Sequence, residues 1–155
     1  MSDEAKQVGG THYAAEVQHW DYADGVNAGY LESAATKYIT RWRKKNGLQD
    51  LRKAATYVAK RIQQYQHQQG PLRGVHKREA MFKRFVADNH IPHREAQIID
   101  LIFHWKRLDS LFEAHARLNE IIKNFNPGET PAKAEDDEEG GPTRAYVNQD
   151  QGTVK

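Results

Sequence analysis

Apolar side chains recur at intervals of three and four residues through most of the chain between residues 30 and 125. This spacing places them on one face of an α-helix, whereas a half-buried strand would alternate polar and apolar residues. No alternation longer than a few residues occurs in the sequence. The sequence therefore predicts an all-α fold.

Two of the predicted helices are joined by a very short connection. The first begins near Tyr30 and ends near Trp42, and the second covers about 48–66. Asn46 and Gly47 lie between them, a pair that typically ends a helix. Such a connection predicts an antiparallel helix hairpin. A shorter helix is expected before it, within 17–29.

The second half of the chain has the same periodicity. Gly70, Pro71 and Gly74 separate it from the hairpin, and a helix is expected around 81–86. The pattern over 92–125 is too long for one ordinary globular helix, so we expect a break within 106–110. The apolar stripe over 98–125 either packs on the hairpin or pairs with a second copy in a homo-oligomer.

These breaks and the composition predict four ranges. A helical domain is expected over 9–69 and a helical extension over 75–126. Residues 127–155 hold seven acidic and three basic side chains and few large apolar ones, so we expect a disordered acidic tail there. A disordered N-terminus is expected over 1–8. Residues 1–126 hold 20 basic and 14 acidic side chains, so the expected folded part is basic.

The composition also excludes several classes of protein and site. The chain has no cysteine, which excludes disulfide frameworks, zinc-thiolate sites and thiol nucleophiles. No stretch approaches the ~20 apolar residues that a membrane span needs, and the polar start is unlike a secretory signal. We therefore expect a cytoplasmic protein with no membrane partner.

Basic side chains are concentrated along the predicted hairpin. One stripe of the first helix carries Lys37, Arg41, Lys44 and Lys45. A comparable stripe of the second helix carries basic and aromatic side chains, namely Lys53, Tyr57, Lys60 and Arg61. The two stripes can converge on one anion, although a lysine-rich outer face is also typical of a solvated helix. Arg41 and Arg43 flank Trp42, and arginine favours bidentate phosphate contacts and aromatic stacking.

Aromatic and acidic side chains precede the hairpin. Trp20 and Tyr22 are candidates to stack on a base, and a tryptophan at helical spacing from Val17 is also typical of a core. Asp21 and Asp24 have a spacing that fits a magnesium site or a helix cap, of which the cap is the commoner arrangement.

Two kinds of nucleotide enzyme are disfavoured by what the sequence lacks. A GxxxxGK loop does not occur, which excludes a conventional P-loop kinase. Helical nucleoside-triphosphate pyrophosphohydrolases hold magnesium with paired acidic motifs, whereas the predicted helices contain isolated glutamates. These glutamates are Glu32, Glu95, Glu113 and Glu120.

Four motifs occur in a fixed order: THY at 11–13, WD at 20–21, KYITRWRKKNG at 37–47 and DLRKAATY at 50–57. Together they resemble a small phage-encoded domain family whose characterised member is a podophage deoxynucleoside monophosphate kinase unrelated to P-loop kinases. The resemblance covers about 9–66. It implies an enzyme of phage nucleotide metabolism, in the cytoplasm of the infected host cell. The implied reaction transfers a phosphoryl group from a nucleoside triphosphate to a deoxynucleoside monophosphate.

The resemblance and the basic stripes together lead to expected roles for individual residues. Lys37 and Arg41 are the expected catalytic residues. Phosphate binding is expected from the other cations of the hairpin, Arg43, Lys44, Lys45 and Lys53. Contacts to the base or sugar are expected from aromatic and histidine side chains, His12, Tyr13, Trp20 and Tyr57. Asp50 is expected to fix the start of the second helix or to orient Arg41 or Lys53. No metal ligand is predicted, and Mg²⁺ is expected only as part of the bound nucleotide.

Two other functions remain open from the sequence. The same hairpin could bind a nucleotide or a nucleic acid without turnover. Alternatively, the chain could be a phage factor that binds and inhibits a host protein through the acidic tail or the long helical pattern.

Overall fold

A computed structural model of the chain describes residues 16–68 and 70–126. The segments 1–8 and 127–155, for which disorder is expected, lie outside the described residues, as do His12 and Tyr13. The described part contains six α-helices and one short 3-10 helix, and no strand. In chain order they are α1 (His19–Gly25), α2 (Tyr30–Arg41), η2 (Trp42–Lys44), α3 (Leu48–Tyr65), α4 (Glu79–Asp88), α5 (His93–Phe103) and α6 (Leu108–Lys123). The all-α prediction is confirmed.

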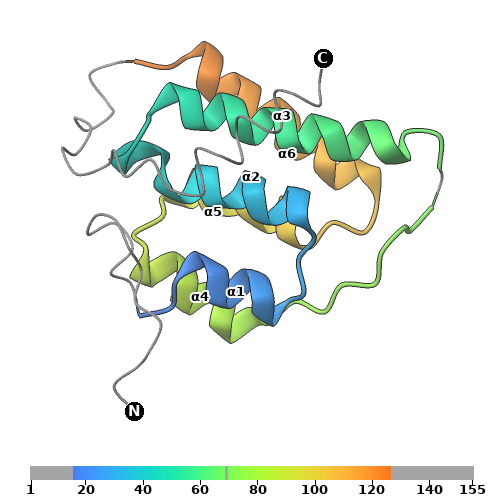
Figure 1. The fold of residues 1–155 in the computed structure, drawn as a ribbon, viewed down its shortest axis with the longest axis horizontal. Coiled ribbons are helices and arrows are strands. Elements are labelled where there is room, and N and C mark those ends of the chain that lie inside the picture. Colours follow the sequence, from blue (N-terminus) through green and yellow to red (C-terminus); the bar gives the residue numbers. More distant parts are fainter. Residues whose placement is uncertain (1–15, 69, 127–155) are drawn as a thin grey trace.

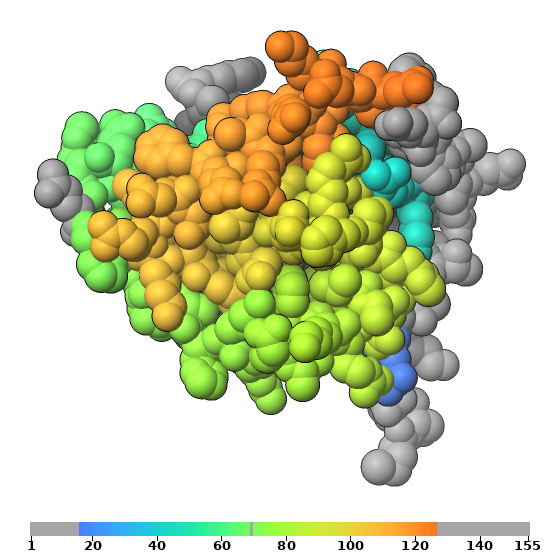
Figure 2. Space-filling model, turned by 180° about the vertical axis from the view of Figure 1, so that it is seen from behind, coloured from blue at the N-terminus to red at the C-terminus, as the bar shows by residue number. Residues whose placement is uncertain are grey.

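The helices form two layers of three. Figure 1 shows α1, α2 and α3 in one layer, with α4, α5 and α6 behind them in the same order. Accordingly, α1 packs on α4, α2 on α5 and α3 on α6. Figure 2 shows the opposite face of the molecule, which α4, α5 and α6 largely cover. The two halves of the sequence therefore each build one layer.

One hydrophobic core lies between the layers. It includes side chains from all six helices, and its largest fully buried members are Trp42, Trp105, Tyr22, Tyr38, Phe85 and Phe103. The apolar stripe over 98–125 packs mainly on α2 and α3 within the same chain. A homo-oligomer is therefore not needed to bury this stripe, and oligomerisation stays a prediction.

The hairpin turn has the geometry that the sequence predicts. Helices α2 and α3 lie side by side and run in opposite directions (Figure 1). Gly47 has a positive φ of 58°, a conformation that side chains with a Cβ rarely adopt. Its backbone N–H donates to the carbonyl of Trp42 at 2.8 Å, which closes the end of η2.

The long helical pattern breaks over 104–107, which begins two residues before the expected range of 106–110 and overlaps it at Lys106 and Arg107. The His104 ring bonds through Nδ1 to Asp100 Oδ1 at 2.6 Å and through Nε2 to the Tyr22 hydroxyl at 2.6 Å. Within the break, the Trp105 indole N–H donates to Glu32 Oε2 at 2.6 Å. The two aromatic residues of the break are thus each hydrogen-bonded to the other layer, His104 to α1 and Trp105 to α2.

No helix in the described part of the chain combines the length and the apolar character that crossing a membrane would require.

Candidate functional site

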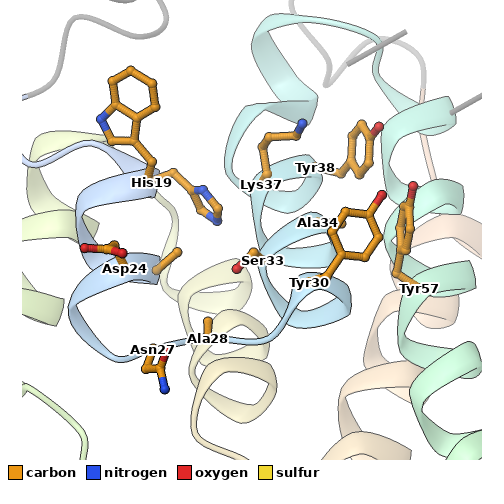
Figure 3. A pocket seen from close by; sticks show the side chains of 12 residues that line it. His19, Asp24, Asn27, Ala28, Tyr30, Ser33, Ala34, Lys37, Tyr38 and Tyr57 are labelled. Carbon is orange, nitrogen blue, oxygen red and sulfur yellow. The ribbon is translucent and has the colours of Figure 1, made fainter. Parts of the chain in front are cut away.

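A pocket of about 360 Å³ opens between α1 on one side and α2 with α3 on the other (Figure 3). Its walls combine aromatic, small and basic side chains. They are His19, Trp20, Ala23, Asp24, Asn27, Ala28, Tyr30, Ser33, Ala34, Lys37, Tyr38 and Tyr57. Four of these, Tyr30, Ser33, Ala34 and Lys37, follow the i, i+3, i+4, i+7 spacing of one face of α2.

Three cations surround the ring of Tyr38, and one of them, Lys37, lines the pocket together with Tyr38. The Lys37 ammonium lies 5.2 Å from the ring centroid, the Arg41 guanidinium 4.9 Å and the Lys53 ammonium 5.3 Å. Lys37 and Arg41 are one helical turn apart on α2, whereas Lys53 comes from α3. The pairing of α2 with α3 therefore brings together three of the cations that the sequence predicted for catalysis and phosphate binding.

The charges around this ring repel one another. Partial burial and the positive charges of Arg41, Lys45 and Lys53 together lower the pKa of Lys37 to about 8, against the opposing effect of Asp50. Lys45 is itself buried. A cluster of cations in a partly buried site favours the binding of an anion, because the anion relieves the repulsion between the cations. Solvent also screens the attraction between the anion and the cations only weakly in such a site.

Arg41 also has a structural partner. Its Nε donates to Asp50 Oδ2 at 3.1 Å, and the two side chains are only 4% and 0% exposed. Asp50 lies in the first turn of α3, so this ion pair holds the start of α3 against the end of α2. Of the alternatives expected for Asp50, the contact supports both fixing the start of α3 and orienting Arg41.

Two of the predicted phosphate ligands, Arg43 and Lys44, do not line the pocket itself. Arg43 donates from Nε to Glu95 Oε2 at 2.8 Å, and its guanidinium lies 4.6 Å from the centroid of the Trp42 ring. Lys44 is exposed and lines an adjoining recess of about 20 Å³, which it shares with Lys37 and Arg41. The sequence spacing placed both on the basic surface, but the turn at η2 directs Arg43 toward the second layer.

The predicted base-binding residues that the structure describes both line the pocket. Trp20 is 44% exposed at the pocket, so the core alternative for this residue is wrong. Tyr57 is buried and stacks on Tyr38, with centroids 5.9 Å apart and an interplanar angle of 13°. Tyr30 meets the Tyr57 ring edge-on at 6.1 Å. Tyr22, by contrast, is fully buried, and this burial raises the pKa of its hydroxyl to about 12.

Several pocket residues were not singled out from the sequence. His19 and Tyr30 line it with two of the small side chains, Ser33 and Ala34. The helical spacing from Tyr30 to Lys37 was a usable signal for three of them. The helical spacing within α2 could not identify His19, because His19 lies in α1.

Of the two acidic residues of α1, Asp21 and Asp24, the first caps the helix. Asp21 Oδ2 accepts a hydrogen bond from the backbone N–H of Gln18 at 2.9 Å, at the start of α1. Asp24 lines the pocket. Within residues 16–68 and 70–126, no three or more His, Asp or Glu side chains gather in an arrangement that could hold a metal ion.

Comparison of the chain with protein-family models, with curated proteins and with solved structures finds no match. The pocket between α1 and the α2–α3 pair, with its cation cluster, is thus identified from its own geometry.

Proposed function

We propose that the pocket binds a nucleotide and that the protein transfers a phosphoryl group from a nucleoside triphosphate to a deoxynucleoside monophosphate. The observation that carries the proposal is the convergence of Lys37, Arg41 and Lys53 around Tyr38 at one end of an aromatic-lined pocket. Cations at one end suit the phosphate, and exposed aromatic rings suit the base.

The size of the pocket supports one nucleotide. A volume of about 360 Å³ is near the lower end of the range for small-molecule sites, which starts at roughly 300 Å³. Trp20 and Tyr30 are both about half exposed, so each offers an accessible ring for the base. A base stacked on an aromatic side chain gains roughly 1–3 kcal/mol.

Phosphoryl transfer is a reaction for which such a site is suited. Its transition state spreads negative charge over the phosphoryl oxygens, and catalysis depends mainly on positioning and on charge neutralisation. We assign the contacts to the transferred group to Lys37 and Arg41, and further charge neutralisation to Lys45 and Lys53. Mg²⁺ that enters with the donor triphosphate would neutralise additional phosphate charge.

The direct test is to incubate the protein with each deoxynucleoside monophosphate and a panel of triphosphates and to follow diphosphate formation. We expect Lys37→Met to lower the rate and the nucleotide affinity at least tenfold, since a charge-assisted contact contributes roughly 1.5–3 kcal/mol. Lys83→Met, which removes an exposed lysine from α4, is the matched control and should leave both unchanged. Equal losses in both variants, or in neither, would contradict the assignment of Lys37.

Binding without turnover is the outcome that separates the alternatives. Nucleotide-dependent thermal stabilisation without diphosphate formation would support nucleotide binding and contradict the proposed kinase activity. If affinity instead falls steeply with salt concentration and does not depend on the base, the protein binds nucleic acid through contacts to many phosphates.

The depressed pKa of Lys37 makes nucleotide affinity depend on pH. A lysine with a pKa of about 8 loses its proton as the pH rises through 8, and an anionic phosphate favours the protonated form. We therefore expect dAMP, whose base does not lose a proton in this range, to bind progressively more weakly between pH 7 and pH 9.5. The loss is at most about tenfold per pH unit.

Isothermal titration calorimetry over this pH range measures the effect. Lys37→Arg keeps its charge throughout, so its affinity should vary less with pH than that of the wild type. A wild-type affinity that stays constant up to pH 9.5 would disprove the role of the Lys37 charge.

A further inference from the structure

His19 is a pocket residue whose tautomer follows from its hydrogen bonds. Its Nε2 lies 2.8 Å from Thr36 Oγ1, and Thr36 Oγ1 donates to the backbone carbonyl of Glu32 at 2.7 Å. A hydroxyl has a single proton, and the carbonyl can only accept. Thr36 therefore accepts from His19, which places the imidazole proton on Nε2 and leaves a lone pair on Nδ1.

The surroundings hold this ring neutral and fixed. Burial lowers the pKa of His19 to about 3, and the positive charge of Lys37 adds to the shift. The ring stacks on Phe103 with centroids 5.7 Å apart and an interplanar angle of 28°, and Phe85 contacts it edge-on at 6.1 Å. An imidazole held in one orientation and one tautomer is a directional hydrogen-bond acceptor.

The acceptor is available to a ligand. Figure 3 shows the His19 side chain projecting from α1 into the space that separates it from α2, on the side where Lys37 and Ser33 lie. In an imidazole, Nδ1 and Nε2 are separated by one carbon, so Nδ1 does not face Thr36. Among residues 16–68 and 70–126, none donates a hydrogen bond to Nδ1.

We propose that His19 Nδ1 accepts a hydrogen bond from the sugar 3′-hydroxyl of the nucleotide in this pocket. The inference rests on the function proposed above and extends it, because it names the sugar group that the site recognises. It makes His19 a ligand-binding residue and predicts that nucleotides without the 3′-hydroxyl are poor ligands.

The order of groups in a nucleotide leads to this choice. Phosphate oxygens at neutral pH are acceptors and would be repelled by the lone pair on Nδ1, so the ligand group at His19 must carry an O–H or N–H. His19 and Lys37 both line the pocket and both line the adjoining recess beside Arg41, which places His19 near the phosphate end of the pocket. The sugar joins phosphate and base, and its hydroxyl is the donor nearest to that end.

Affinities for a matched pair of ligands test the proposal in the full chain. We expect the wild type to bind a deoxynucleoside monophosphate about three- to tenfold more tightly than its 2′,3′-dideoxy analogue, as one hydrogen bond implies. His19→Phe keeps an aromatic ring against Phe103 but has no acceptor. In that variant the two ligands should bind within about twofold of each other.

Nitrogen NMR of the wild-type histidines gives a second readout, which reports on the tautomer itself. His19, identified by its absence from the His19→Phe spectrum, should be neutral and protonated on Nε2 between pH 5 and pH 8. Its Nδ1 resonance should shift on addition of the deoxynucleotide and much less with the dideoxy analogue. A proton on Nδ1 would overturn the proposal.

The outcomes separate this inference from the proposed function. If nucleotides bind but the 3′-hydroxyl makes no difference to wild-type affinity, the role of His19 is wrong and nucleotide binding stands. If neither nucleotide binds, both fail together, whatever the tautomer of His19.

Discussion

Replacing Glu32 with alanine is expected to lower the free energy of unfolding by about 3–5 kcal/mol, the usual effect of removing one partner from a buried ion pair. The Glu32 side chain is only 3% exposed. Both its oxygens accept from the guanidinium of Arg61, each at 2.8 Å, and Oε2 also accepts from the Trp105 indole at 2.6 Å. Loss of the carboxylate would leave the fork of Arg61 and the buried indole N–H without their acceptor.

The position of these partners explains why the effect should be large. Glu32 lies in α2, Arg61 in α3 and Trp105 in the turn between α5 and α6. Arg73, in the segment that joins the two layers, comes within 3.6 Å of Glu32. The Glu32 carboxylate therefore links the two layers, and all of its partners are distant from it in the sequence.

Urea unfolding measures the effect, and the chain offers a matched control. Glu113 is also paired with an arginine, Arg117, but these side chains are 50% and 39% exposed. Glu113→Ala should cost less than about 1 kcal/mol, as exposed ion pairs do. A similar cost for Glu32→Ala and Glu113→Ala would contradict a structural role for the Glu32 network.

The same network predicts a direction for the effect of acid. Burial alone would raise the pKa of Glu32, but the hydrogen bonds from Arg61 and Trp105 outweigh it and hold the pKa below the ordinary value of 4.5. A carboxyl group whose pKa is lower in the folded state stabilises the fold above its unfolded pKa. Its contribution is complete above pH 4.5 and is lost as the pH falls through the folded value.

The second large effect is expected at Asp50. Asp50→Ala should lower the free energy of unfolding by about 3–5 kcal/mol, because Arg41 would keep its buried position and lose its carboxylate. Arg41→Ala should cost a similar amount for the converse reason. The double variant should cost clearly less than the sum of the two, since each single change already breaks the same interaction.

Asp109→Ala is a suitable control for this pair. Asp109 lies in the first turn of α6 as Asp50 does in α3, but its side chain is exposed. It should cost no more than about 1 kcal/mol, the contribution of a favourable charge at a helix N-terminus. Strict additivity in the Arg41 and Asp50 variants would show that the two side chains are not coupled.

These stability effects decide which variant can test the site. Arg41 is among the expected catalytic residues, but a loss of activity in Arg41→Ala would not distinguish catalysis from folding. Lys37 lines the pocket and is only partly buried, whereas the Arg41 side chain is 4% exposed and is ion-paired with the buried Asp50. Lys37 is therefore the better residue for the first activity measurement.

Local patterns in the sequence were sufficient for the helices. The three- and four-residue spacing predicted α2 and α3 to within a residue or two, and Asn46 with Gly47 predicted the turn between them. The same periodicity placed Lys37 and Arg41 on one stripe of α2, and Lys37 lines the pocket. These features follow from interactions within about one helical turn, which a short stretch of sequence contains.

The partners of the charged side chains depended on the tertiary structure. A basic stripe does not show that Arg43 turns to Glu95, 52 positions away, or that Arg41 pairs with the buried Asp50 while Lys37 lines the pocket. Nor could it place His19 of α1 against Thr36 of α2. By itself the sequence determined the all-α class and most of the helix boundaries, because helix periodicity is local. Only the packing of the two layers decided which cations stabilise the fold and which line the pocket, because burial and ion pairing depend on contacts between segments far apart in the chain.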